Sequence, residues 1–433
     1  MSKFQLITLG VFIVCIIAGV IAFATFKSKS TTAQLPPVTI WGTFPSDVMT
    51  QYVANINLTL ANPITVNYAQ KDPATFTQDF VAALARGNGP DAILVPTDLL
   101  LSQASKLSLI PYTLMSQPAF RNSYVSEASL YENGNNGLLG IPFTIDPLVM
   151  YWNRDIFNAA GLPTHPTYWG DFAAVNAKLT VKDQNGNVRK SAIAMGSFYN
   201  ITNARAILGT LFLQSGNPVT TTQSDGSIVS TLSAAATVDP TPALQFFTQF
   251  ADSANANYSW NKGLPNDKSA FLSGMLASYF GFASEIKDIR AKNPNLNFDV
   301  TGMPVLKNGG TSGNAVYGKM YGFSMVNASA NKNTVWQVIS ILTSPANLLA
   351  LSSTMYLPTV RTDAIAPSAT DPYMGIFNNE ALVARSWLDA DPAISNQILS
   401  NMVEAVNSGQ KTPTQAIRDA GDQTDVAIQQ AAQ

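Results

Sequence analysis

Three features of the sequence predict an α/β protein with more than one domain. The chain has 433 residues, which is too long for one ordinary hydrophobic core. Hydrophobic residues make up 46% of it, so there is enough apolar material for two interiors. Short apolar strand patterns alternate with helical patterns, joined by Gly, Pro and Asp. This alternation predicts mostly parallel sheets with helices on both faces.

The N-terminal segment is predicted to be a membrane anchor or a signal. Residues 4–26 are uncharged and apolar, and a helix that spans a bilayer needs only about 20 such residues. We favour an uncleaved transmembrane helix at 1–27 over a long signal peptide cut after Ala24. The single cysteine, Cys15, lies within this run, which excludes a disulfide inside the chain. Residues 28–37 are then a polar linker.

The elements of the body follow from their residue patterns. Runs of β-branched and apolar residues predict strands, and apolar residues at helical spacing predict helices. Strands are expected at 38–44, 64–70 and 90–96, and helices at 46–60, 73–87 and 99–110. Further along we expect a hairpin near 226–232, and within 271–305 a helix, a strand, a second helix and a second strand. A flexible joint follows at 307–314, then a strand at 321–326 and a helix at 333–344. From residue 372 the pattern is helical to the end.

The composition argues against several classes of function. Charged residues are only 12% and the formal net charge is −2, whereas nucleic-acid binding needs a clustered basic face. His165 is the only histidine and lies in a loop beside prolines. With one histidine and one cysteine, neither a zinc site nor a His-based triad is expected. We therefore expect no metal, no cofactor and no nucleic-acid partner.

One stretch places a carboxylate and a proline between two apolar strands. It reads GIPFTIDPLVMYWNRDIFNAAGLP, and Asp146 and Pro147 interrupt it. Proline removes a backbone donor and fixes φ, which is consistent with a strand that bends. In parallel α/β sheets ligands bind beyond the carboxyl ends of the strands. Trp41 and Phe44 lie near one such end and Asp98 lies just after another, although a helix N-cap explains Asp98 equally well.

The order of these motifs resembles a known family. PDAILVP with DLL, the stretch around Asp146, and then TYWGDF are similar to the extracellular solute-binding proteins of ABC importers, family 1, above all the maltose- and oligosaccharide-binding proteins. FLSGMLASYFGFASEI, NPNLNFDVTGMPV and YGFSMVNASANKNTVWQVISILTSPAN continue the likeness, which runs from about residue 38 to the end. The resemblance implies a two-lobe periplasmic-binding-protein-like (type II) fold with a hinge. One lobe is expected at 38–144 plus 320–360, and the other at 148–316 plus 366–433.

The resemblance also implies a ligand site between the lobes. The stretch 143–148 is the expected first hinge crossing, with later crossings near 314–321 and 356–363. Sugar rings offer apolar faces to aromatic side chains, and their hydroxyls need carboxylates and amides. The candidate substrate-binding residues are Trp41, Phe44, Asp98, Asp146, Tyr151, Asn153, Tyr199, Trp260, Phe280, Gly281, Tyr321 and Trp387. For Trp260, burial away from any ligand is an equally good interpretation.

The function implied is capture without chemistry. The chain is expected to be the monomeric, extracytoplasmic binding component of an ABC transporter, which takes a saccharide and delivers it to membrane permease subunits. Its body would lie outside the cell membrane, held by the single N-terminal span. The alternatives are a binding protein for a polyamine or other polar solute, and a tethered glycan-binding sensor. A glycoside hydrolase using Asp98 and Asp146 is disfavoured, because neither carboxylate has a catalytic motif around it.

Overall fold

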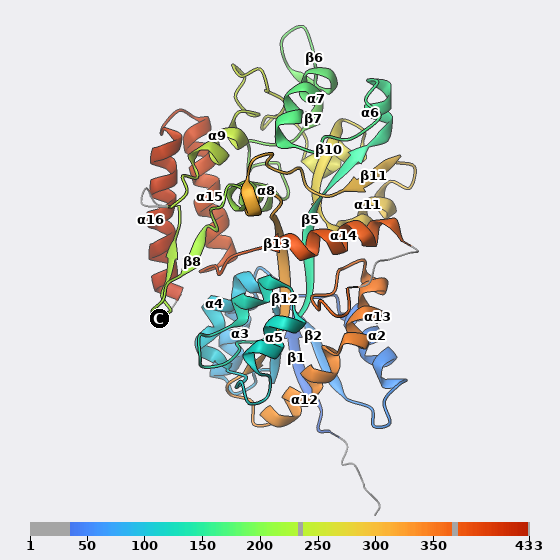
Figure 1. Ribbon diagram of the computed structural model, residues 1–433, viewed down its shortest axis with the longest axis vertical. Coiled ribbons are helices and arrows are strands. Elements are labelled where there is room, and N and C mark those ends of the chain that lie inside the picture. The colour runs from blue at the N-terminus through green and yellow to red at the C-terminus, as the bar shows by residue number, and fades with distance from the viewer. Residues whose placement is uncertain (1–34, 233–236, 366–370, 432–433) are drawn as a thin grey trace, which may run out of the picture.

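The computed structural model describes residues 35–232, 237–365 and 371–431. The predicted membrane segment at 1–27, and most of the linker, lie outside these residues. The described chain forms two α/β lobes, one above the other, joined by two long strands (Figure 1). The two-lobe α/β fold predicted from the sequence is therefore confirmed, while the exact lobe boundaries stay predictions.

The first lobe is built on three parallel strands, β1 (Val38–Gly42), β2 (Val66–Gln70) and β3 (Ala92–Pro96), in the order β2-β1-β3. Every residue of β3 is buried, as expected for a central parallel strand. In α3 (Phe76–Ala85), Phe76, Phe80 and Ala83 recur at helical spacing and face the core. The other helices of this lobe are α2 (Ser46–Asn57), α4 (Leu100–Gln103), α5 (Gln117–Ser123), α12 (Lys332–Leu342) and α13 (Pro345–Met355).

The second lobe has its own sheet, in which β10 (Leu276–Phe282) lies between β5 and β7 (Val188–Ile193). Its remaining strands are β6 (Val181–Lys182), β11 (Phe298–Thr301), β13 (Ala384–Arg385) and the predicted hairpin, β8 (Thr220–Thr222) with β9 (Ile228–Ser230). Its helices are α6 (Arg154–Ala159), α7 (Phe172–Leu179), α8 (Ala204–Gln214), α9 (Thr241–Thr248), α10 (Asp267–Leu272), α11 (Ile286–Lys292), α14 (Pro372–Val383), α15 (Pro392–Asn407) and α16 (Pro413–Ala431). The last three confirm the predicted helical C-terminus except at 384–391, which includes β13.

The hinge is formed where β5 (Ile141–Asn153) exchanges one partner for another. Its first half pairs antiparallel with β12 (Val316–Val326), up to the pair Pro147–Gly318. Its second half pairs with β10, beginning at Leu148 opposite Phe282. Proline lacks a donor, so it is tolerated where a ladder ends. The expected interruption at Asp146 and Pro147 is thus a change of partner within one continuous strand, and not a break.

The helix predicted at 99–110 is confirmed only over Leu100–Gln103, and its second half is wrong. A short 3-10 turn (Thr97–Leu99) leads into α4 (Leu100–Gln103), and a second turn (Ala104–Lys106) leads into β4 (Leu107–Ser108). The strand forms because Leu107 and Ser108 pair with the end of β12. This distant pairing overrides the local helical pattern.

In the described part of the chain, no single helix has both the length and the apolarity to cross a membrane. By length and composition alone, the bent pair 332–342 and 345–352 passes the same test.

Candidate functional site

A cavity of about 380 Å³ lies between the two lobes. The first lobe contributes residues around the start of α3 and the end of the 3-10 turn Thr97–Leu99, and the second contributes residues around the starts of α8 and α15. Strand β12 lines the hinge side. The lining residues are Pro73, Ala74, Thr77, Leu99, Thr202, Asn203, Arg205, Ala206, Phe282, Tyr317, Lys319, Asp391, Pro392, Ala393 and Asn396. The wall therefore combines hydroxyl and amide groups with two aromatic rings and three charged side chains.

Asp146 fastens the hinge strand to the second lobe. Its carboxylate accepts hydrogen bonds from Ser284 N at 3.0 Å and from Ser284 Oγ at 2.6 Å. Burial raises the pKa of Asp146 to about 6, against the lowering effect of the Ser284 hydrogen bonds. Lys319 lies directly opposite Asp146 on β12. Asp146 thus holds the junction between the lobes behind the cavity wall.

Arg205, near the start of α8, connects three parts of the chain. Its Nη1 lies 3.2 Å from Asp98 Oδ2 in the first lobe, and its Nη2 is bonded to Asp389 Oδ2 in the second. The guanidinium also lies over Trp387, at 5.1 Å from the ring centroid, and over Tyr317 at 5.8 Å. Asp98 is therefore one partner of an ion pair, and its side chain caps no helix.

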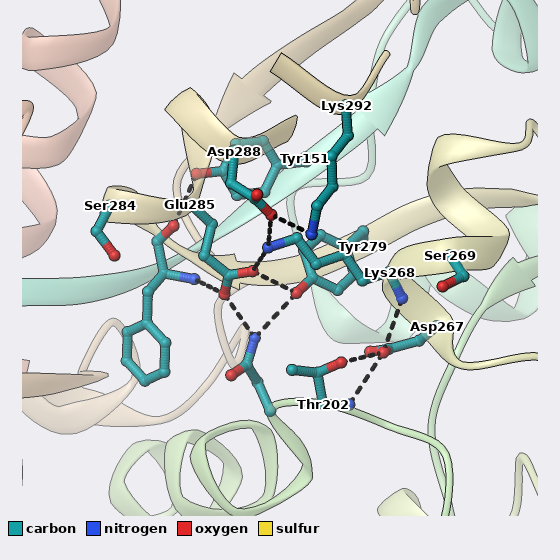
Figure 2. Close-up of polar contacts among 12 residues, drawn as sticks. Tyr151, Thr202, Asp267, Lys268, Ser269, Tyr279, Ser284, Glu285, Asp288 and Lys292 are labelled. Atoms are coloured by element: carbon teal, nitrogen blue, oxygen red, sulfur yellow. Dashed lines mark hydrogen bonds and ion pairs between the residues drawn. The ribbon is translucent and has the colours of Figure 1, made fainter. Parts of the chain in front are cut away.

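A polar network behind the cavity centres on Glu285 (Figure 2). Its carboxylate accepts hydrogen bonds from Tyr279 OH at 2.7 Å and from the backbone N–H of Phe282 at 2.9 Å. Lys268 Nζ lies 2.8 Å from the same carboxylate and 2.6 Å from Asp288. The network joins β10, α10 and α11, and so fixes Phe282, which lines the cavity.

The same network orients Asn203. Its side-chain Nδ2 donates to Glu285 Oε1 at 2.9 Å, to Phe280 O at 3.1 Å and to Tyr279 OH at 3.2 Å. Asn203 occupies the N-cap position of α8, where its oxygen would ordinarily accept from the helix backbone, yet it makes no such bond. Its Oδ1 accepts no hydrogen bond from any described residue, and Asn203 lines the cavity. Asn203 Oδ1 is therefore a hydrogen-bond acceptor of fixed orientation at the cavity.

Thr202, next to Asn203, is held by Asp267. The carboxylate accepts from Thr202 N at 2.9 Å and from Thr202 Oγ1 at 2.7 Å (Figure 2). Burial raises the pKa of Asp267 to about 6, and its hydrogen bonds to Thr202 act in the opposite direction. The loop before α8 is thus fixed by two carboxylates of the second lobe.

None of the twelve residues predicted to bind ligand lines this cavity. Asp98, Asp146 and Trp387 lie directly behind its wall, in the contacts described above. In the first lobe, Phe44 packs edge to face against Tyr321, with ring centroids 4.8 Å apart. Trp41 is half-buried, and Lys71 Nζ lies 3.7 Å from the centroid of its indole ring.

The remaining candidates belong to the second lobe, mostly in its core. Tyr151 OH donates to Phe282 O at 2.7 Å, and Asn153 caps α6 by accepting from the backbone of that helix. Phe280 is buried, and Gly281 lies so close to neighbouring tyrosine rings that a Cβ would fall 2.5 Å from the nearest atom.

Two candidates in the second lobe differ sharply in exposure. Trp260 is buried and donates its indole N–H to Asn200, whereas Tyr199 is 76% exposed. A ligand contact for any of the twelve stays a prediction.

The sequence predicted none of the wall residues as ligand contacts, and the polar ones among them include Thr202, Asn203, Arg205 and Lys319. One signal was available, because Arg205 is the only charged residue in the otherwise apolar helix ARAILGTLFLQ. A charge at the start of such a helix needs a partner or a function. Among the described residues, no group of three or more His, Cys, Asp or Glu side chains is placed to hold a metal ion.

Comparison with known proteins identifies the family. Residues 51–375 match the family model described as "Bacterial extracellular solute-binding protein". The chain belongs to this family. The body of this solute-binding protein is therefore extracytoplasmic, and the proteins it resembles are binding proteins. No curated protein matches its sequence.

Solved structures similar to this solute-binding protein share its fold at low sequence identity. A cyclo/maltodextrin-binding protein complexed with maltotetraose has a TM-score of 0.71 and 17% identity, covering 92% of this chain and 98% of the other. A cyclic α-maltosyl-1,6-maltose binding protein from Arthrobacter globiformis has a TM-score of 0.71 and 14% identity, with coverage of 91% and 99%. The sugar-binding protein MalE from Xanthomonas citri has a TM-score of 0.71 and 15% identity, with coverage of 91% and 98%.

Proposed function

We propose that this solute-binding protein captures a sugar or oligosaccharide in the interlobe cavity and delivers it to the permease of an ABC transporter. The observation that carries the proposal is the composition of the cavity wall, which both lobes supply. Its volume of about 380 Å³ lies within the ~300–1,000 Å³ typical of small-molecule sites. The sugar-binding proteins with the same fold support the choice of ligand class.

The chemistry of the wall suits a polyhydroxylated ligand. Phe282 and Tyr317 offer aromatic surface to the apolar face of a sugar ring. Asn203 Oδ1 is free to accept a hydroxyl proton, and Thr77 can donate or accept. Lys319 Nζ makes no hydrogen bond or ion pair with any described residue and lies 5.2 Å from the Phe282 ring centroid. It is therefore available to donate to a ligand oxygen.

Closure follows from the position of the cavity. A ligand there touches Thr77 of the first lobe and Asn203 of the second at the same time. Because both contacts exist only when the lobes are together, binding shifts the population toward the closed form. We also propose that residues 1–27 anchor the protein, so that capture takes place close to the permease.

A cationic solute such as a polyamine has less support. The charged residues that line the cavity are Arg205, Lys319 and Asp391, so cations outnumber carboxylates there. A polyamine site needs the opposite balance, because each buried ammonium group requires an anionic partner.

A thermal-shift screen of the full-length protein tests the proposal. Malto- and manno-oligosaccharides, spermidine and amino acids would each be added in excess, and a ligand at a hundredfold excess over its Kd stabilises by about 2.7 kcal/mol. We expect a rise in Tm with one class of sugar, lost in Asn203→Leu and Lys319→Met and kept in the control Lys178→Met, at an exposed position on α7. A rise with spermidine or amino acids only, and none with sugars, would overturn the saccharide assignment.

A further inference from the structure

The contact surface between the two lobes, here called the seam, contains an ion pair between two side chains of the protein. Asp98 follows β3 in the first lobe, and Arg205 is on α8 in the second, with Asp98 Oδ2 and Arg205 Nη1 3.2 Å apart. The exposed fractions of the two side chains are 5% and 12%. We propose that this pair is an interlobe latch, which biases the protein toward the closed form independently of any solute.

The half of the latch in the second lobe is preorganised. Asp389 pairs with Arg205 and also accepts a hydrogen bond from Ser395 Oγ at the start of α15. Trp387 and Tyr317 flank the guanidinium. Arg205 is therefore held in place by its own lobe, and only the approach of Asp98 is needed to complete the contact. Preorganisation reduces the conformational entropy lost when the lobes meet.

Two further polar contacts lie along the same seam. Thr97 Oγ1 is 3.3 Å from Ser386 Oγ, and Glu127 of the first lobe accepts from Ser386 N and from Ser386 Oγ, the latter at 2.7 Å. Asp98 therefore lies next to two polar contacts that also join the lobes. The donors in these two contacts are neutral, whereas Asp98 and Arg205 form an ion pair across the seam.

Two buried polar atoms without hydrogen bonds weaken the latch. Asp98 Oδ1 and Arg205 Nε are buried and make no hydrogen bond with any described residue. Desolvation that is not fully compensated offsets part of the attraction between buried charges. When the lobes part, Asp98 regains water while Arg205 keeps Asp389. The contact therefore shifts a balance between open and closed forms and does not lock the lobes.

The test compares two substitutions that make the same chemical change on either side of one guanidinium. Asp98→Asn removes the charge across the seam, and Asp389→Asn removes the charge within the second lobe. Both are made in the full-length chain with Cys15→Ser and dyes at Asn62→Cys and Gln184→Cys, which are exposed sites in opposite lobes. Single-molecule energy transfer without any sugar then gives the closed-to-open ratio directly.

We expect Asp98→Asn to lower the closed-to-open ratio about tenfold, the change for loss of one charged hydrogen bond, and Asp389→Asn to leave it unchanged or higher. Arg205→Lys keeps the positive charge but lacks the planar guanidinium that reaches both carboxylates. We therefore expect a smaller fall in the closed-to-open ratio for this variant. It replaces Asp98→Asn as the test if Asp98→Asn does not fold. A ratio that stays at the wild-type value in both Asp98→Asn and Arg205→Lys overturns the latch. So does an equal fall in the Asp98 and Asp389 variants. Because no sugar is present, the result is independent of the proposed ligand.

Discussion

Glu127 makes the stability of this protein depend on pH in a direction that can be worked out from its surroundings. The side chain lies in the 3-10 segment Ser126–Tyr131, is 4% exposed, and is hydrogen-bonded to Ser386. Burial raises its pKa from 4.5 to about 7, although the Ser386 hydrogen bonds and the charge of Arg385 act to lower it. In the unfolded chain the same carboxyl group ionises near its ordinary value.

Between these two pKa values the folded state holds a proton that the unfolded state has released. The free energy of unfolding therefore falls as pH rises through this window. The difference between 4.5 and about 7 corresponds to ~3 kcal/mol in total. Most of that loss is expected between pH 5 and pH 8.5. It is complete once the carboxyl group has ionised in the folded state as well.

Urea denaturation of wild type and Glu127→Gln at pH 5 and pH 8.5 measures the effect. The neutral amide has no proton to lose, so the variant should lose ~2–3 kcal/mol less than wild type over this range. Burial also raises the pKa values of Asp146, Asp267 and Asp389, so these groups add to the pH dependence of both proteins. The effect of Glu127 is therefore the difference between wild type and Glu127→Gln in the free energy of unfolding lost from pH 5 to pH 8.5. Glu404→Gln, at a solvent-accessible ion pair with Lys262, is the control. Parallel pH profiles for wild type and Glu127→Gln would refute the argument.

Two further predictions concern packing and polar order around the cavity. Gly209→Ala should cost about 1–3 kcal/mol in urea denaturation, because its Cβ would fall 2.8 Å from Trp387; the matched change Gly375→Ala, in open space on α14, should be neutral or stabilise by up to about 1 kcal/mol. Asn203→Asp should destabilise by about 1–3 kcal/mol, because it turns a carboxylate oxygen toward Glu285. Adding Glu285→Gln to Asn203→Asp should recover part of that loss in a double-mutant cycle, and additive losses would contradict the contact.

The sequence predicts the parts of this fold that depend on local pattern. The alternation of strands and helices predicted α/β sheets, and the family resemblance implied two lobes with a crossing at the stretch that holds Asp146 and Pro147, where β5 changes partner. The failure at 99–110 has the opposite cause: Leu107 is recruited as a strand by β12, more than two hundred residues away in the chain. Local propensity cannot register a partner at that distance.

The candidate site was harder to predict because side-chain orientation decides it. Asn203 sits at a helix N-cap, and a local rule predicts that its oxygen points to the helix backbone. Three acceptors from β10 and Glu285 instead draw its nitrogen inward. Asp98 likewise looked like a cap or a ligand contact, and its actual partner is an arginine on a different lobe. The Asn203 contacts exist only once the second lobe has folded, and the Asp98 contact only once the two lobes meet.

The place of β12 in the first lobe has a consequence for synthesis and folding. In the sheet order β2-β1-β3-β12-β5, β12 separates β3 from β5, yet it is made long after both. Until β12 has left the ribosome, β3 and β5 each carry an unpaired edge in the middle of the future sheet. Exposed edges of this kind invite pairing with other chains, and closing so long a loop slows folding. The nascent chain therefore needs protection, or must stay unfolded, until synthesis has passed residue 326 and most of the second lobe has been made.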